Sequence, residues 1–185
     1  ETRPTLDRVK ESLFNIINER IYDSKVLDLF SGSGQIGIEA LSRGASQAVF
    51  VEKNKLAIDC IEKNLNKARL EAQATIYKED VFAALNKLST HSPFDFIFMD
   101  AAKGQYINFW PEIKRLIVDG GVIVTDNVLQ DGDILDSHFI VDRRNRTIHK
   151  RIREYLYEIC QDEDYDTTIH PPYNLLRLEK NTQQE

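Results

Sequence analysis

Short apolar runs of strand length alternate with longer amphipathic patterns of helical period through most of this chain. The expected strands are residues 25–30, 47–52, 74–77, 94–100 and 121–126, followed by a hairpin of 166–170 and 175–178. The expected helices are residues 3–18, 34–43, 55–70, 81–88, 105–116 and 142–161. Strands that alternate with helices predict a parallel sheet with helices on both faces. We therefore expect an α/β fold with a mostly parallel, doubly wound seven-stranded sheet, closed at its end by one antiparallel strand near the C-terminus.

The length of 185 residues fits one domain with a full hydrophobic core, with a cofactor half at 1–90 and an acceptor half at 91–185. The net charge of -6 argues against nonspecific nucleic-acid binding by the whole surface but permits a local basic patch. No apolar run approaches the ~20 residues that span a bilayer. The two cysteines, Cys60 and Cys160, lack CxxC spacing, which is typical of a reducing compartment. We expect a cytoplasmic protein without a membrane partner, either a monomer or a homodimer.

A glycine-rich turn, Phe30-Ser31-Gly32-Ser33-Gly34, follows the first expected strand. Ligands of open α/β sheets bind beyond the carboxyl ends of the strands, which is where this turn lies. Gly32 and Gly34 lack a Cβ, so the backbone can turn sharply and approach a ligand closely. The pattern is also found in dinucleotide enzymes and can mark a plain tight turn, so it indicates a nucleotide-type cofactor without identifying it.

Three acidic residues, one inside the first strand and two at the ends of the next strands, indicate an adenosine cofactor. Asp28 lies inside the first strand, where its carboxylate could receive an ammonium-bearing ligand. Glu52 ends the second strand, where it could accept both ribose hydroxyls or lie solvated at a strand end. Asp80 follows the third strand, where it could meet an adenine amino group, cap the next helix, or do both. The expected cofactor ligands are Asp28, Gly32, Gly34, Glu52 and Asp80.

Within about residues 2–88 the chain contains, in this order, the stretches RPTLDRVKESLFNII, LDLFSGSGQIGIEALSRGA and VFVEKN. With these stretches the first half of the chain resembles the bacterial rRNA guanine-N2 methyltransferases of the RsmD type. It implies a Rossmann-like class I methyltransferase fold that binds S-adenosylmethionine. That family also has a DPPY-type motif after its fourth strand, which stacks on the base and orients its amine. This chain instead has Asp100-Ala101-Ala102-Lys103 after its fourth strand. Its HPPY segment at 170–173 lies between the last two expected strands, and we interpret it as a turn.

The second half contains the stretches FDFIFMDAAKGQY, GGVIVTDNVL, DRRNRTIHKRIREYL and DYDTTI. With these stretches it resembles the metal-dependent O-methyltransferases of the catechol and caffeoyl-CoA type, whose bacterial branch includes enzymes that methylate 5-hydroxyuridine in tRNA. The resemblance implies a divalent metal on Asp100, Asp126 and Asn127, with Lys103 as the catalytic lysine. Three hard oxygen ligands suit Mg²⁺ or another divalent cation, which would lower the pKa of a bound hydroxyl. Asp100 would thus serve both the metal and catalysis.

Each of these residues also has a structural alternative. Asp100 and Asp126 could cap loops, Asn127 could be a turn residue, and Lys103 could be a solvated lysine at a helix start. A basic cluster before and inside the last expected helix could meet RNA phosphates, or could be a solvated face paired with nearby acids. Its members are Arg143, Arg144, Arg146, Lys150, Arg151 and Arg153.

The two halves together predict an S-adenosylmethionine-dependent methyltransferase that we interpret as an engineered hybrid of two families, with the seam between Asp80 and Phe94. The main hypothesis is a Mg²⁺-dependent O-methyltransferase acting on a small hydroxylated acceptor or on tRNA. The alternatives are an rRNA guanine-N2 methyltransferase, a folded hybrid that binds the cofactor without turnover, and, more distantly, a dinucleotide oxidoreductase.

Overall fold

The computed structural model describes residues 7–88, 93–102, 104–129, 146–170 and 174–182. Its strands are β1 (Lys25–Leu29), β2 (Gln47–Val51), β3 (Ala74–Tyr77), β4 (Phe94–Met99), β5 (Ile117–Thr125), β6 (Tyr165–His170) and β7 (Leu175–Lys180). Its α-helices are α1 (Asp7–Ile17), α2 (Gln35–Ser42), α3 (Lys55–Ala68), α4 (Val81–Leu88), α5 (Tyr106–Leu116) and α6 (Arg146–Gln161). Two short 3₁₀ helices, η1 (Asn18–Arg20) and η2 (Glu71–Gln73), complete the described elements. No helix in these ranges is long and apolar enough to cross a membrane.

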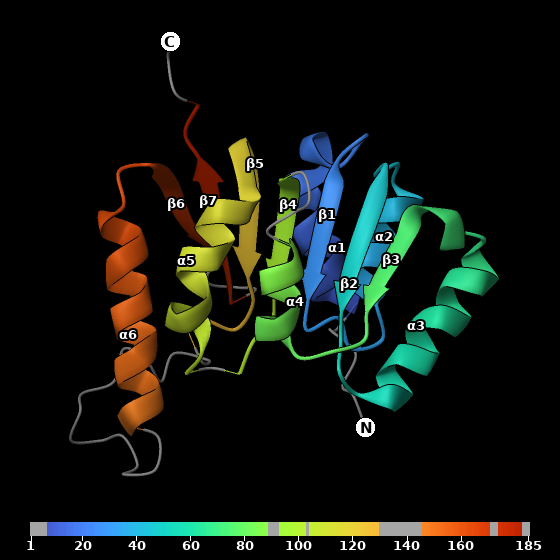
Figure 1. Ribbon diagram of the computed structural model, residues 1–185. Helices are drawn as coiled ribbons and strands as arrows, with labels where there is room; N and C mark the ends of the chain where they lie inside the picture. The colour runs from blue at the N-terminus through green and yellow to red at the C-terminus, as the bar shows by residue number, and fades with distance from the viewer. Residues whose placement is uncertain (1–6, 89–92, 103, 130–145, 171–173, 183–185) are drawn as a thin grey trace.

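The strands form one sheet in the order β3-β2-β1-β4-β5-β7-β6 (Figure 1). Strands β1 to β5 pair in parallel, and β7 is antiparallel to both of its neighbours. The expected single antiparallel strand is therefore confirmed, but it lies inside the sheet and not at its end. The burial of the two last strands explains this order. Strand β7 buries Leu175, Leu176 and Leu178, whereas β6 buries only Tyr165 and suits an exposed edge.

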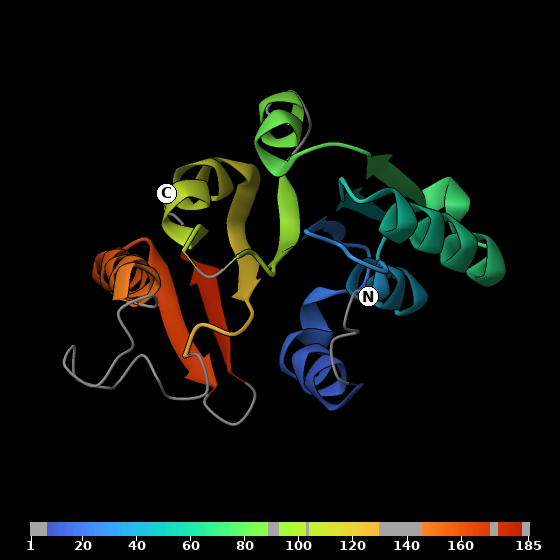
Figure 2. The same ribbon diagram turned by 90° about the horizontal axis from the view of Figure 1, so that it is seen from below.

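The sheet separates two apolar layers, because successive side chains of a strand point to opposite faces. Leu27 of β1 and Ile97 of β4 pack with residues of α4, α5 and α6 on one face. Val26 and Phe96 pack with residues of α1, α2 and α3 on the other face. Figure 2 shows α1 and α2 on the opposite side of the sheet from α4 and α5. This arrangement is the doubly wound α/β sandwich that the alternation of strands and helices predicts.

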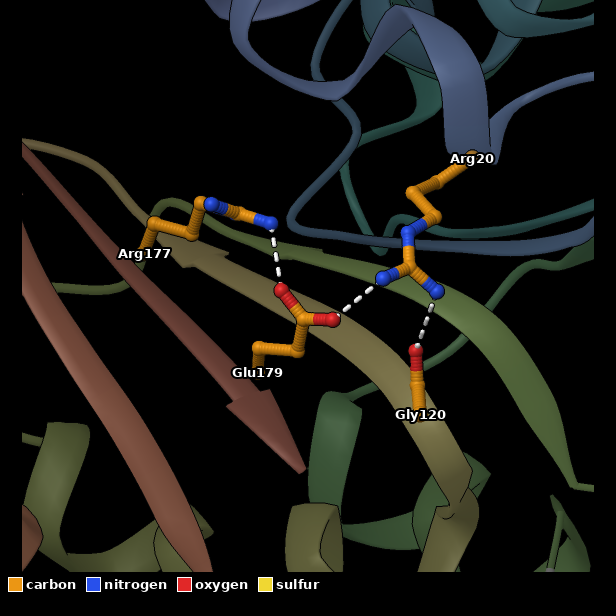
Figure 3. A network of polar contacts seen from close by, with 4 residues as sticks. All are labelled: Arg20, Gly120, Arg177 and Glu179. Carbon is orange, nitrogen blue, oxygen red and sulfur yellow. Dashed lines mark hydrogen bonds and ion pairs between the residues drawn. The ribbon is translucent and has the colours of Figure 1, made fainter. Parts of the chain in front are cut away.

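A polar network ties the first helical segment to the last strand (Figure 3). Arg20, at the end of η1, donates to a carboxylate oxygen of Glu179 on β7 and to the Gly120 carbonyl oxygen of β5, 3.3 Å away. Arg177 donates to the other carboxylate oxygen of Glu179. The Arg20 side chain is 48% exposed, so each contact contributes little, at most about 1 kcal/mol. The network fixes the position of η1 against the sheet more than it stabilises the fold.

Two element boundaries differ from those expected. Strand β5 begins at Ile117 and not at Gly121, because α5 ends at Leu116 and the chain enters the sheet directly. Its pairing with β4 then shifts register between Phe94 and Phe96. The helices expected from residues 3 and 142 are described from Asp7 and Arg146 onward, and their earlier residues lie outside the described part of the chain.

Candidate cofactor and acceptor site

The parallel strands β1, β2, β4 and β5 end at one edge of the sheet, and this edge carries the acidic residues and glycines expected to function together. It is the lower edge in Figure 1, and Figure 2 views the molecule from that side. Described loops at this edge lead from β1 to α2, from β2 to α3 and from β3 to α4. The site can therefore be built strand by strand from the residues that follow β1, β2, β3, β4 and β5.

The loop after β1 makes a tight left-handed path into α2. Phe30, Gly32 and Gly34 all have positive φ angles, 64°, 54° and 77°. The Gly34 amide donates to the Ser31 carbonyl at 2.7 Å, and Gly34 itself precedes the first residue of α2. A Cβ at Gly34 would lie 3.0 Å from Ile61 Cγ1, so α3 crowds this position as well. Glycine at position 34 thus allows the positive φ angle and avoids a clash with α3.

Ser31 holds this loop to the two central strands. Its hydroxyl donates to the Asp28 carbonyl at 2.6 Å and accepts from the Val51 amide at 3.0 Å. Its own amide donates to the Val51 carbonyl at 3.1 Å. These bonds leave the loop with little freedom before any ligand binds. Sequence reasoning passed over Ser31, although a serine between positive-φ residues at a strand end is a recognisable turn signal.

Asp28 is 1% exposed and lies on the α2 face of β1, where its Oδ2 accepts from the Gly37 amide at 3.1 Å. Burial raises the pKa of this carboxyl to about 7, the Gly37 hydrogen bond works against the rise, and Asp100 and Glu52 raise it further. Two other carboxylates are thus close enough to act on Asp28. A buried carboxylate in such surroundings is suited to meet a positive ligand group.

Gly37 allows α2 to lie directly on β2. A Cβ at this position would come within 2.3 Å of Phe50 Cε1, closer than any side chain permits. Only glycine therefore lets the α2 backbone pack this closely on the Phe50 ring. The close approach brings the Gly37 amide within hydrogen-bonding distance of the Asp28 carboxylate.

Glu52 follows β2 and accepts three backbone hydrogen bonds. Its Oε2 accepts from the Gly32 amide at 2.9 Å, and its Oε1 accepts from the Lys53 and Asn54 amides at 2.9 and 2.8 Å. The carboxylate therefore joins the glycine loop of β1 to the loop of β2. A carboxylate offers about four acceptor positions, so acceptor capacity remains for a ligand hydroxyl.

Asp80 follows β3 and caps α4, since its Oδ1 accepts from the Phe82 amide at 3.1 Å. Its Oδ2 lies 3.3 Å from Lys53 Nζ. A small hollow of about 50 Å³ is lined by Phe30, Glu52, Lys53 and Asp80, together with three neighbours. The structure therefore brings Glu52 and Asp80 to one hollow beside the glycine loop.

Asp100 and Asp126, which follow β4 and β5, approach a common neighbour. Tyr106 at the start of α5 is 1% exposed, and its hydroxyl donates to the Asp126 carbonyl at 2.7 Å. Burial raises the pKa of this phenol well above its usual value, and Asp100 and then Asp126 raise it further. The Asp126 amide also donates to the Met99 carbonyl at 3.1 Å. The two carboxylates expected to bind metal thus lie around one tyrosine, and Asp100 is exposed.

Asn127 is held by a residue that sequence reasoning missed. It has a φ angle of 56°, and its Oδ1 accepts from Asn174 Nδ2 at 2.6 Å. Asn174, at the start of the last turn before β7, also accepts from the Leu129 amide through its Oδ1 at 2.6 Å. Asparagine tolerates the left-handed region better than most residues, which is the local signal for both positions. Their pairing across 47 positions of sequence has no local signal.

The oxygen donors fit a hard divalent cation in type, since two carboxylates and one amide oxygen stand on neighbouring strand ends. The Asn127 oxygen already accepts one hydrogen bond, so it has one lone pair left for such an ion. Among the described residues, no group of three or more His, Cys, Asp or Glu side chains could hold a metal ion. The expected catalytic Lys103 and residues 171–173 of the HPPY segment lie outside the described residues.

Comparison with known protein families gives a match over most of the chain. The family described as conserved hypothetical protein 95 matches residues 1–150. The ribosomal RNA small subunit methyltransferase D of Haemophilus influenzae is 39% identical over 99 residues, 53% of this chain and 51% of that protein. The protein of the same name from Buchnera aphidicola (Acyrthosiphon pisum) is 34% identical over 163 residues, 85% of this chain and 82% of that protein. The chain spans about half the length of several curated relatives that it matches.

Catechol-type enzymes provide a second, weaker similarity. The catechol O-methyltransferase of Niastella koreensis is 37% identical over 79 residues, 42% of this chain and 36% of that protein. An O-methyltransferase structure from Bacillus cereus, solved with S-adenosylhomocysteine, superposes with a TM-score of 0.77 at 21% identity and covers 98% of this chain and 83% of that one. At that identity the superposition supports the fold alone. The fold is that of the class I S-adenosylmethionine-dependent methyltransferases, as expected.

Proposed function

Since this chain belongs to the family described as conserved hypothetical protein 95, we propose that it transfers a methyl group from S-adenosylmethionine to RNA, with ribosomal RNA as the acceptor. The observation that carries the proposal is the convergence of the glycine loop, Asp28 and Glu52 at the carboxyl edge of the sheet. The relatives named as rRNA methyltransferases supply the acceptor class. They favour rRNA over the small hydroxylated acceptor of the main sequence-based hypothesis.

We propose that the cofactor is bound by the five residues expected from sequence, each using a different group. The Asp28 carboxylate would accept the ammonium of the methionine part. Gly32 and Gly34 provide a path on which the backbone can approach the ligand without a side chain in the way. Glu52 would accept a ribose hydroxyl with its remaining lone pair, and Asp80 would face the adenine amino group from the same hollow.

We propose that Asp100 stands nearest to the reacting atom of the acceptor. It is exposed at the end of β4 and close enough to Asp28 to raise the pKa of that buried carboxyl. A carboxylate there can accept a hydrogen bond from the exocyclic amine of a base and hold it toward the methyl donor. Methyl transfer depends mainly on proximity and alignment of the two reacting atoms. Ala101 and Ala102 replace the aromatic motif of the RsmD type, so base stacking needs another side chain.

A second candidate function is methyl transfer to a hydroxyl, assisted by Mg²⁺. The convergence of Asp100 and Asp126 around Tyr106 favours it. Asp100, Asp126 and Asn127 would hold the ion, which would lower the pKa of the acceptor hydroxyl. Lys103 would take the proton in this scheme. Two expectations stay predictions. One is that the chain is an engineered hybrid with its seam between Asp80 and Phe94, and the other is that residues 1–185 form a single domain. The pairing of β1 with β4 in one continuous sheet is compatible with both.

The first test is calorimetric titration of S-adenosylmethionine into the protein, with Mg²⁺ and again with EDTA. Micromolar binding supports the cofactor assignment, and no binding in either buffer contradicts the enzymatic proposal. Transfer of a labelled methyl group to rRNA should follow, with the modified nucleoside identified by mass spectrometry. A methylated guanine formed in EDTA supports the base-amine reaction. A methylated hydroxyl formed only with Mg²⁺ supports the second candidate and contradicts the first.

A further inference from the structure

We infer that the outer face of α6 binds one nucleotide of the RNA acceptor, next to the one that is methylated. The inference rests on the proposed RNA acceptor and deepens it, because it places a specific contact outside the cofactor site. The observations that carry it are the location of α6, a pocket along its surface, a buried histidine with no hydrogen-bond partner in the described part of the chain, and an exposed tyrosine among cationic side chains.

Helix α6 begins at the same edge of the sheet as the cofactor loops. Figure 1 shows it beside β6, with its first turns at the lower edge, where β4 and β5 end. Arg151 Nη1 donates to the Gly104 carbonyl at 3.5 Å, a long contact that nevertheless places the helix against the loop after β4. That loop begins with Asp100. A nucleotide on α6 would therefore lie near the acceptor position, as a neighbouring residue of the same RNA strand would.

The surface offers the two kinds of contact that single-stranded RNA uses. A pocket of about 600 Å³ has Arg146, His149, Lys150, Arg153 and Tyr157 among its lining residues, and all of its described lining comes from α6. The intervals of four, three and four between Arg146, Lys150, Arg153 and Tyr157 place these four side chains along one stripe of the helix. Cationic heads attract phosphates, whereas aromatic rings and flat guanidinium groups stack on bases.

His149 is compatible with a polar occupant of this pocket. It is 4% exposed, it lines the pocket, and neither ring nitrogen has a hydrogen-bond partner among the described residues. Buried polar atoms nearly always find a partner, so two unpaired nitrogens on one ring call for an occupant that can donate or accept. Ribose hydroxyls and base edges can do both. An apolar ligand would leave both nitrogens unsatisfied.

The charge of the surroundings makes the stripe distinctive. The whole chain carries a net charge of -6, whereas the described lining of this pocket has three cations and one acid, Glu154. Lys150 lies 3.6 Å from Glu154, but both side chains are at least half exposed, and such a pair is easily exchanged for a phosphate. Tyr157 is 68% exposed, which leaves its ring available for stacking. A nucleotide, with its base, ribose and phosphate, can contact both the aromatic and the cationic side chains of this lining, whereas a bare anion can contact only the cationic ones.

The test measures binding of a fluorescein-labelled single-stranded RNA of roughly 12 nucleotides by anisotropy. Tyr157→Ala should weaken binding about tenfold, and Tyr157→Phe should retain it because the ring remains. Lys150→Glu should weaken binding and reduce the slope of log affinity against log salt by about 0.7 for one lost phosphate contact. Lys63→Glu makes the same charge change on the exposed surface of α3, and Tyr22→Ala removes another exposed aromatic ring. Both control variants should bind like the wild type.

Competition distinguishes a nucleotide site from a general anion site. Unlabelled uridine monophosphate should displace the RNA at concentrations at which inorganic phosphate does not. Equal competition by phosphate, equal effects in the test and control variants, or no RNA binding by the wild type would each overturn the inference. Calorimetric titration of every variant with S-adenosylmethionine measures cofactor binding and so tests the proposed function independently of RNA binding. If the wild type does not bind S-adenosylmethionine, the methyltransferase proposal is contradicted. If the cofactor binds but Tyr157→Ala leaves RNA binding unchanged, only the α6 site is contradicted.

Discussion

Replacing Asp28 by asparagine should stabilise the cofactor-free protein at neutral and alkaline pH. The carboxyl is 1% exposed, and burial raises its pKa from 3.8 in the unfolded chain to about 7 in the fold. The folded state thus binds this proton more tightly than the unfolded state. The stability associated with it is fully present below about pH 4 and is lost as the pH rises through 7. Asparagine keeps an oxygen for the Gly37 amide and carries no charge at any pH.

The size of the effect follows from the two pKa values. A rise of about three units corresponds to about 4 kcal/mol lost by the wild type once the pH is well above 7. Part of this loss has already occurred at pH 5. Between about pH 5 and pH 8, the wild type should therefore lose about 2.5 kcal/mol that the variant keeps.

Urea unfolding of the cofactor-free proteins at these two pH values measures the effect. The free energy of unfolding of Asp28→Asn, relative to the wild type, should increase by about 2.5 kcal/mol from the lower to the higher pH. Asp59→Asn, the same change at an exposed position of α3, is the matched control and should show no such increase. If both variants track the wild type across this range, the reasoning from burial to a raised pKa at Asp28 is refuted.

Three further predictions concern packing and the loops. Gly37→Ala should lower the free energy of unfolding by about 1–3 kcal/mol in urea, because its Cβ would lie 2.3 Å from the Phe50 ring; an unchanged midpoint contradicts the packing of α2 on β2. Asn174→Gly permits the positive φ but removes two side-chain hydrogen bonds, so the free energy of unfolding should fall by about 1–2 kcal/mol. An unchanged free energy would mean that these bonds to the loop after β5 do not stabilise the fold. Arg20→Ala should cost less than about 1 kcal/mol in the same assay because the contact with Glu179 is half-exposed, and a larger loss would show that Figure 3 depicts a structural anchor.

The strand–helix alternation made most of the fold predictable, since buried parallel strands appear as continuous apolar runs. The segment 94–99 is an example, because four consecutive buried residues, Phe96 to Met99, can be read without knowledge of their partners. Glycines of the cofactor loop were predictable for a similar local reason, since only the backbone at those positions had to be judged. Features that depend on one segment at a time can be inferred from sequence.

Features that depend on two distant segments could not be inferred in this way. The insertion of β7 between β5 and β6 depends on which strand of the hairpin pairs with β5, whereas the sequence predicts only the hairpin of 166–170 and 175–178. The bond between Asn174 and Asn127 depends on where the last turn meets the loop after β5. The sequence places His149 inside an expected helix, and only the packed fold shows that it is buried with no hydrogen-bond partner among the described residues.

The position of β7 has a consequence for the order of events during synthesis. Strand β6 leaves the ribosome first, yet the one described strand with which it pairs is β7, which follows it. Until residues 175–180 emerge, β5 exposes an unpaired edge and β6 has nothing to join. The β1–β3 region can assemble early, since its strands pair with one another and with β4, whereas the β5–β7–β6 region must wait for the final residues. Nascent chains stalled just before Leu175 should therefore be cleaved by protease in the β5 and β6 region, and chains extended past Lys180 should resist.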